Sequence, residues 1–185
     1  RLWVIDPIDG TANFLRGLPY WCVVLALTVD GAPLLGLTFD PVHGELFVAR
    51  RGRGATRDGA AIGVAARAAE ESCVGLSYSF KGGPGAYERL LAGLMEHRLD
   101  HRRMGSSALA LAHVADGRLD AMVCPSCSSW DVVAGLLLVQ EAGGLATDYS
   151  EGATLLERRG VAAAAPGIAG TIAAISGETL RPARR

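Results

Sequence analysis

Apolar residues in the first 72 positions come in short runs that turn-forming residues separate. Runs of this length, rich in β-branched and aromatic residues, predict strands, and Asp30-Gly31 predicts a hairpin turn between two of them. The connections are too short for crossover helices, so the strands should pair antiparallel, as a meander. The strands predicted on this basis cover residues 2–5, 21–29, 34–39 and 45–49.

From about residue 73 onward the pattern changes, because segments with a helical spacing of apolar residues alternate with short apolar runs. Such alternation predicts strands joined by helices, and therefore a largely parallel sheet covered on both faces. The predicted strands cover 73–80, 99–103, 119–123, 145–147 and 161–165, and the predicted helices cover 87–96, 108–115, 130–142 and 168–175. We therefore expect one α+β domain over 1–185, with an antiparallel part over 1–72 and an α/β part over 73–185.

The first predicted strand leads directly into a pair of acidic residues. Residues 2–5 are apolar and should form a buried, central strand, which Pro7 should end because proline cannot donate a ladder hydrogen bond. Asp6 would then lie at the carboxyl end of the strand, and Asp9 can return to the same side of the turn. Two carboxylates with the carbonyl oxygen of Ile8 make a hard-oxygen site of the kind that Mg²⁺ prefers.

Gly10 and Thr11 follow the two aspartates and should open a short helix. Backbone N–H groups at a helix start face outward at its positive end, where a phosphate binds readily. Asp-Pro and Asp-Gly are also ordinary turn pairs, and most such turns bind nothing. The combination of two carboxylates with a phosphate cradle within six residues nevertheless favours a metal-assisted phosphoryl site.

Composition narrows the class of protein. The 185 residues are 50% hydrophobic and 20% charged, which is typical of a globular chain that buries a core. The formal net charge of −1 argues against broad binding of nucleic acid, and no apolar run approaches membrane-spanning length. Nothing resembles a signal peptide, so the four cysteines are expected to be reduced thiols in the cytoplasm.

The first strand and its turn form a longer string, Trp3-Val4-Ile5-Asp6-Pro7-Ile8-Asp9-Gly10-Thr11-Ala12-Asn13-Phe14. It resembles the first signature of the inositol monophosphatase family at every fixed position. The second signature of that family is matched by Trp130-Asp131, which Val132-Val133-Ala134-Gly135 and Glu141-Ala142-Gly143-Gly144 follow. The resemblance implies a layered αβαβα sugar-phosphatase fold and a homodimer. It also implies Mg²⁺-dependent hydrolysis of a small polyol or amino-alcohol phosphate monoester, with inositol monophosphate and histidinol phosphate as the leading candidates.

The resemblance assigns roles to the residues of the two signatures. Asp6 would bridge two Mg²⁺ ions, and the Ile8 carbonyl would bind one of them. Asp9 and Asp131 would hold the other ion, and Asp131 would also contact the substrate. Thr11 would position the attacking water, which makes Asp6, Asp9 and Thr11 the catalytic residues. Without the resemblance, Asp131 at a helix start is a carboxylate that the helix dipole alone favours.

Gly105, Ser106 and Ser107 precede a predicted helix, so backbone N–H and hydroxyl groups there are placed for polar contact. The resemblance maps this segment onto the substrate-contacting loop of the family. Its residues would then bind the substrate together with Gly10 and Thr11, which are expected to contact the phosphate. Serine caps of the helix would explain the same residues without any ligand.

Two features depart from the family pattern. Seven residues before Asp131, where inositol phosphatases carry a Glu that binds a ring hydroxyl, this chain has Cys124. A thiol is a poor acceptor for a hydroxyl, so Cys124 in the substrate site argues against specificity for myo-inositol phosphate. The family also has a metal-binding, water-activating Glu upstream of the first signature, and this chain begins at Arg1 without it. We therefore expect an N-terminal segment to be lacking. Because a metal ligand would be lost with that segment, the alternative function is that of a catalytically impaired family member that acts as a binding or regulatory protein.

Cys124-Pro125-Ser126-Cys127 offers a function from another class. A Cys-x-x-Cys sequence between a strand and a helix is typical of thiol redox proteins. The antiparallel meander before it does not fit that fold, and the chain has no second such cysteine pair for a structural zinc. Redox chemistry therefore remains an alternative that only this one motif supports.

Overall fold

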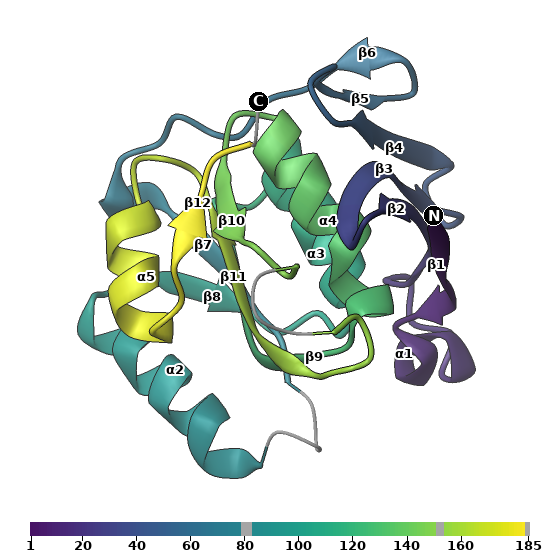
Figure 1. The fold of residues 1–185 in the computed structure, drawn as a ribbon. Coiled ribbons are helices and arrows are strands. Elements are labelled where there is room, and N and C mark those ends of the chain that lie inside the picture. The colour runs from purple at the N-terminus through teal and green to yellow at the C-terminus, as the bar shows by residue number, and fades with distance from the viewer. Residues whose placement is uncertain (79–82, 151–153, 184–185) are drawn as a thin grey trace.

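The computed structural model describes residues 1–78, 83–150 and 154–183, and Figure 1 shows their arrangement. The strands of the first sheet are β1 (Leu2–Asp9), β2 (Cys22–Val29), β3 (Ala32–Asp40), β4 (Glu45–Arg50), β5 (Ala55–Arg57) and β6 (Ala60–Ala61). They follow one another in chain order, and every neighbouring pair is antiparallel. Asp30 and Gly31 both have positive φ and form the tight turn between β2 and β3. The antiparallel meander predicted for the first part of the chain is thereby confirmed.

β1 differs from the sequence prediction in its length and its place. It runs through Pro7 to Asp9, and its register against β2 shifts between Asp6 and Asp9. β1 is an edge strand of the described sheet, and an edge accommodates a proline because one side of the strand needs no ladder hydrogen bonds. Three of its apolar side chains are more than half exposed: Leu2, Trp3 and Ile5. The prediction of a buried, central strand that Pro7 ends is therefore wrong.

The second sheet is mixed. Its strands are β7 (Cys73–Leu76), β8 (Asp100–Arg102), β9 (Ala121–Cys127), β10 (Leu145–Thr147), β11 (Arg159–Ala164) and β12 (Leu180–Arg181). They lie in the order β12–β10–β11–β9–β7–β8, and among them β7 pairs parallel with β8 and with β9, whereas the other neighbours pair antiparallel. Helices connect the three parallel strands, and parallel neighbours need such crossovers. The sheet was expected to be largely parallel, but parallel pairing is confined to β9, β7 and β8 on one side of it.

Helices cover both faces of the second sheet. α3 (Ser107–Ala115) and α4 (Ser129–Glu141) lie between the two sheets, whereas α2 (Pro84–Glu96) and α5 (Ala169–Ser176) cover the outer face of the second sheet (Figure 1). The described residues thus stack as sheet, helix pair, sheet and helix pair, which are four of the five layers of the αβαβα arrangement that the resemblance implies. α3 and α4 are buried along almost their whole length because both of their faces are covered.

Two glycines let α4 approach its neighbours closely. A Cβ atom on Gly36 of β3 would lie 2.8 Å from the carbonyl oxygen of Ala134. A Cβ atom on Gly135 would lie 2.6 Å from the Cβ atom of Leu111 in α3. Close-packed interiors leave no room for such overlaps, so only glycine fits at either position. This packing fixes the start of α4, and therefore Asp131, relative to the first sheet.

The other predicted elements are present with shifted ends. α1 (Thr11–Leu15) opens at Thr11 as predicted, and β9 continues through Pro125 to Cys127, beyond the end at residue 123 that was predicted for this strand. β7 ends at Leu76, and positions 79–80 of the predicted strand lie outside the described residues. β5, β6 and β12 are too short to show a periodic pattern, so the sequence does not predict them. No helix in the described part of the chain is both long and apolar enough to cross a membrane.

Candidate active site

Three carboxylates from two distant parts of the chain meet at the carboxyl end of β1. Asp6 and Asp9 come from β1, and Asp131 comes from the first turn of α4. One carboxylate oxygen from each residue lies within 4.8 Å of the other two, which is close enough for the three to share a cation. The structure thus brings together the three acidic residues that the two sequence motifs single out.

Asp6 and Asp131 are oriented by the backbone of their own turns. Asp6 Oδ1 accepts a hydrogen bond from the Ile8 N–H at 3.0 Å. Asp131 Oδ2 accepts one from the Ser128 N–H at 3.0 Å, as part of the capping box that begins α4. The helix-start role that the sequence allowed for Asp131 is therefore real, and it holds the carboxylate facing Asp6. One carboxylate oxygen of Asp6 and one of Asp131 lie within 4.8 Å of each other.

Asp9 is oriented from a different element, the start of α3. Its Oδ2 atom accepts a hydrogen bond from the Ala108 N–H at 2.9 Å and another from the Ser106 hydroxyl. Ser106 is buried and is also the N-cap of α3, because its hydroxyl oxygen accepts from the Leu109 N–H at 3.2 Å. One serine thus caps a helix and fixes a candidate metal ligand that lies 97 positions away in the sequence.

Burial disfavours the ionised form of all three carboxyl groups. It raises the pKa of Asp9 to about 7; the hydrogen bonds from Ser106 and Ala108 oppose this, and the negative charges of Asp131 and Asp6 add to it. Burial likewise raises the pKa values of Asp6 and Asp131. The site therefore concentrates more negative charge than its surroundings stabilise. A divalent cation would relieve this, and a donor set of carboxylate oxygens fits Mg²⁺.

Ile8 and Thr11 lie between the carboxylates and α1. The Thr11 hydroxyl donates a hydrogen bond to the Ile8 carbonyl oxygen at 2.8 Å, so the two residues predicted to bind metal and to orient water are in direct contact. Gly10 is the N-cap of α1 with φ of 89°, and a Cβ atom there would lie 3.0 Å from the Tyr20 carbonyl oxygen. Glycine is therefore needed for this turn. Because α1 has only five residues, its dipole adds little to the site.

Asn13 is a site residue whose role the sequence motif does not reveal. Its Nδ2 atom donates hydrogen bonds to the carbonyl oxygens of Tyr20 and Met104, both at 2.7 Å. The second bond ties α1 to the segment before α3, where Gly105 has φ of 92° and passes close to the Asn13 amide. Asn13 therefore fixes one wall of the site against another. Its partner Met104 is 91 positions away, which no local pattern could indicate.

A cavity of about 870 Å³ opens beside the carboxylates. Its described wall consists of Asp9, Thr11, Ala12, Asn13, Arg16, Ser77, Tyr78, Arg103, Gly105, Ser107, Cys124, Ser126, Cys127, Asp131 and Arg158. Among the residues predicted to contact substrate, Thr11, Gly105, Ser107, Cys124 and Asp131 line this cavity. Ser106 instead lies beneath Asp9, and Gly10 is not part of the wall. The volume is sufficient for a small phosphate ester.

The cysteine pair does not have the setting of a redox motif. Cys124 and Cys127 are free, buried thiols within β9, and not on an exposed turn before a helix. Burial raises the pKa of the Cys127 thiol well above its ordinary value, so it stays protonated at neutral pH. Protonated, buried thiols are poor nucleophiles. The structure therefore offers the redox alternative no support.

A second group of potential ligands, Asp40, Glu45 and His113, lies elsewhere in the first sheet and α3. Its charges are already paired. Arg118 donates to both carboxylate oxygens of Glu45, at 2.5 and 2.7 Å, and to the His113 ring at 3.1 Å. His43 contacts Asp40 at 2.7 Å. Arg118 and His43 already supply charged or hydrogen-bonding partners to these three residues, so we assign the group a structural role.

Comparison with known proteins gives one consistent result. A sequence model of the inositol monophosphatase family matches residues 1–180. The chain is 44% identical over 151 residues to the Nus factor SuhB of Xylella fastidiosa, covering 80% of this chain and 55% of that protein. It is 38% identical over 164 residues to the inositol-1-monophosphatase of Mesorhizobium japonicum, covering 87% of this chain and 62% of that protein.

The fold agrees with the sequence comparisons. The solved structure of an inositol monophosphatase from Anabaena superposes with a TM-score of 0.84 at 35% sequence identity, over 96% of this chain and 72% of that one. A SuhB structure from Mycobacterium tuberculosis superposes with a TM-score of 0.82 at 32% identity, over 94% of this chain and 70% of that one. The chain spans less than two thirds of the length of the curated relatives that it matches.

Proposed function

Because this chain belongs to the inositol monophosphatase family, we propose that it carries the metal centre of a Mg²⁺-dependent phosphatase. The reaction is the hydrolysis of a small phosphate monoester to an alcohol and inorganic phosphate. One observation carries the proposal: Asp9 and Asp131 belong both to the three-carboxylate group and to the wall of the adjacent cavity. A cation and a substrate of suitable size would thus meet at the same residues.

The carboxylates of Asp6, Asp9 and Asp131, with the Ile8 carbonyl, are the groups that we expect to hold Mg²⁺. A divalent ion bound there supplies Lewis-acid chemistry, because it withdraws charge from the phosphate and offsets the charge on the departing alkoxide. The surrounding residues keep the ligands in place before the ion arrives, which lowers the reorganisation that binding requires. Thr11, hydrogen-bonded to Ile8, is the residue that we assign to orienting the attacking water.

The alcohol part of the ester would occupy the cavity beyond the carboxylates. Gly105, Ser107 and Cys124 form part of its wall and are our candidates for contacts with the substrate. Inositol monophosphate and histidinol phosphate are the two esters to test first, because the family resemblance names them. Inositol phosphatases of the family carry, at the position of Cys124, a carboxylate that accepts a hydrogen bond from a ring hydroxyl. Because a thiol is a poor acceptor, Cys124 favours an ester other than myo-inositol phosphate.

The test is phosphate release with and without Mg²⁺, measured on residues 1–185 and on the longest protein that the gene encodes. Asp6→Asn should abolish Mg²⁺-dependent release, because it removes a charged ligand while keeping the side-chain size. Asp30→Asn is the matched control, since Asp30 lies in the exposed turn between β2 and β3, at the other end of the sheet. Equal turnover by Asp6→Asn and Asp30→Asn would refute the proposal.

A second candidate function rests on the names of several relatives. The proteins of Xylella fastidiosa and Pasteurella multocida that this chain resembles at 44% and 39% identity are called Nus factors. We propose a binding role in a transcription complex as the alternative, together with the homodimer that the family resemblance implies. Light scattering of the longest form would measure the oligomeric state. Copurification of RNA polymerase subunits with a catalytically inactive Asp6→Asn protein would favour the binding role.

A further inference from the structure

The charges on the cavity wall have an uneven distribution. Its acidic side chains are Asp9 and Asp131, and both belong to the group that would hold a cation. Its basic side chains are Arg16, Arg103 and Arg158, and no other carboxylate lines the wall within the described residues. Once a divalent ion neutralises the aspartates, the remaining formal charge on this wall is that of three guanidinium groups.

The arginines reach the cavity from three separate segments. Arg16 lies just past the end of α1, where one of its guanidinium nitrogens donates to the Ala12 carbonyl oxygen at 3.3 Å. Arg103 follows β8, and its guanidinium carbon lies 5.7 Å from the centre of the Tyr78 ring. The Arg16 and Arg103 side chains are exposed, so their donors can reach a ligand in the cavity.

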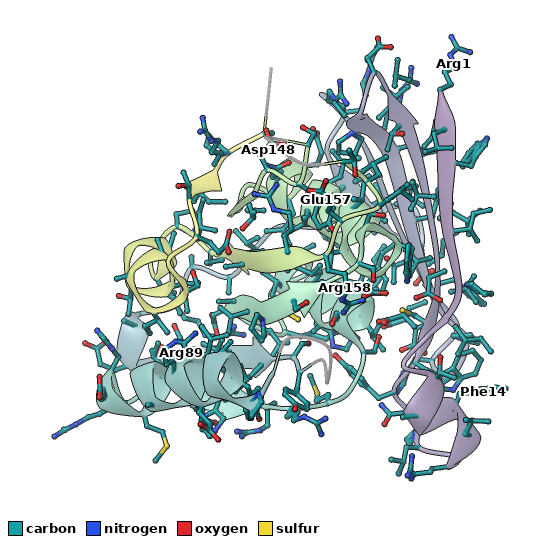
Figure 2. The ribbon with its side chains drawn as sticks, turned by 60° about the horizontal axis from the view of Figure 1, so that its bottom comes forward. Arg1, Phe14, Arg89, Asp148, Glu157 and Arg158 are labelled. Carbon is teal, nitrogen blue, oxygen red and sulfur yellow. The ribbon has the colours of Figure 1, made fainter. Side chains whose placement is uncertain are left out.

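Arg158 is held more rigidly than the other two. It donates to the Ser126 carbonyl oxygen at 2.8 Å and to the hydroxyls of Ser126 and Ser128. Figure 2 shows its side chain in the space between the second sheet and the first sheet. It lines the cavity together with Asp131, and its partner Ser128 donates its backbone N–H to the Asp131 carboxylate, so Arg158 lies close to the candidate metal ligands. Arg158 therefore holds a fixed positive charge near the carboxylate group, whereas the exposed Arg16 and Arg103 can reach further into the cavity.

We propose that the substrate is a phosphate monoester whose alcohol part carries a second anionic group, a carboxylate or another phosphate, and that Arg16 and Arg103 bind this group. The proposal rests on the phosphatase function proposed above and narrows its substrate class. Guanidinium groups match carboxylate and phosphate oxygens with charge-assisted hydrogen bonds.

The same wall disfavours the other two classes of ester. An amino-alcohol phosphate would place its ammonium group among three like charges. A neutral polyol phosphate would leave the guanidinium donors without an anionic partner, and the thiol at Cys124 is a poor acceptor for its hydroxyls. Of the three classes of ester, the one with a second anionic group is the one that can pair with the guanidinium groups of this wall.

The experiment compares phosphate esters that differ in the charge of the alcohol part alone. Glucitol 6-phosphate is neutral beyond its phosphate, 6-phosphogluconate adds a carboxylate, glucitol 1,6-bisphosphate adds a phosphate, and 2-amino-2-deoxyglucitol 6-phosphate adds an ammonium group. In each hydrolysis one water is consumed, the bond from phosphorus to the ester oxygen breaks, and inorganic phosphate and an alcohol form. We expect kcat/KM to be at least tenfold higher for a second-anion ester than for the neutral one, and lowest for the ammonium ester. The carboxylate and bisphosphate arms identify which anion the site prefers.

Two variants test whether the arginines cause this preference. Arg16→Gln and Arg103→Gln should each reduce the ratio of kcat/KM between second-anion and neutral esters by about fivefold to tenfold. The exposed Arg53→Gln, in the turn between β4 and β5, is the matched control and should leave the ratio unchanged. Equilibrium dialysis in the inactive Asp6→Asn background gives a readout without turnover. There, Arg103→Gln should raise the dissociation constant for the preferred second-anion ester by a similar factor.

The outcomes separate this inference from the proposed function. If no ester is hydrolysed in a Mg²⁺-dependent way, the phosphatase function itself fails. If all four esters are hydrolysed at similar rates, or if Arg16→Gln and Arg103→Gln leave the ratio unchanged, the phosphatase stands and the second-anion inference is overturned. A preference for the ammonium ester would overturn it as well.

Discussion

Replacing Asp9 with Asn should stabilise the metal-free protein at neutral and alkaline pH. Burial raises the pKa of Asp9 from 3.8 to about 7, so the folded state keeps a proton that the unfolded state has already released. The free energy of unfolding should therefore fall as the pH rises from about 4 to about 7 and stay low above that. Three pKa units, at about 1.36 kcal/mol each, correspond to about 4 kcal/mol.

The assay is thermal unfolding in a metal chelator between pH 4 and pH 8, for the wild type and for Asp9→Asn. Asn keeps an oxygen that can accept the hydrogen bonds from Ser106 and Ala108, so the substitution removes the charge and little else. The two proteins should melt alike at pH 4. At pH 8 the variant should melt about 10 °C higher, since 1 kcal/mol corresponds to about 2–4 °C in a chain of this size.

Adding Mg²⁺ at pH 8 supplies the control. The wild type should gain stability with ion concentration, because an ion that binds only the folded state shifts the equilibrium by mass action. Asp9→Asn should gain much less. The difference in melting temperature between the two proteins should therefore shrink or change sign. Parallel melting curves for the two proteins across the whole pH range, without Mg²⁺, would refute the electrostatic reasoning about Asp9.

Three further predictions concern single side chains. Ser106→Ala removes the cap of α3 and a bond to Asp9, so denaturant unfolding should show a loss of about 1–2 kcal/mol, and a change within error would contradict the assigned role. Gly135→Ala should cost about 1–3 kcal/mol by overpacking against Leu111, and a stabilised variant in the same assay would show that the contact relaxes freely. Cys124→Glu places an acceptor in the cavity wall and should raise kcat/KM for polyol phosphates relative to second-anion esters by roughly tenfold; an identical ranking of esters would show that Cys124 does not contact them.

The pairing of Asp6 with Asp9 could be predicted because its geometry is local. Asp6 and Asp9 are three positions apart at the end of one strand, and a turn there brings both carboxylates to the same side. The sequence also reveals that Asp131 lies at a helix start, but only the family resemblance, and no local pattern, predicted that it joins Asp6 and Asp9. The meander was predictable for a related reason, since its short connections permit little else.

What could not be predicted depends on partners far away in the sequence. Leu2, Trp3 and Ile5 have the apolar pattern of a buried strand, and only the sheet order places them at an exposed edge. The role of Asn13 depends on Met104, and the role of Ser106 depends on Asp9. Periodicity describes which face of an element is apolar, but it carries no information about which other element covers that face.

The junction of β1 with α4 also has a consequence for folding. Its carboxylates come from two segments that lie about 120 residues apart in the sequence. An ion bound between Asp9 and Asp131 would therefore act as a removable crosslink that closes a very long loop. Such a crosslink exists only when β1 is packed beside the starts of α3 and α4. Each tenfold change in free Mg²⁺ above the dissociation constant would then shift the stability of the whole layered structure by about 1.4 kcal/mol. The Mg²⁺ concentration of the solution would thus influence how long the folded chain resists unfolding and proteolysis.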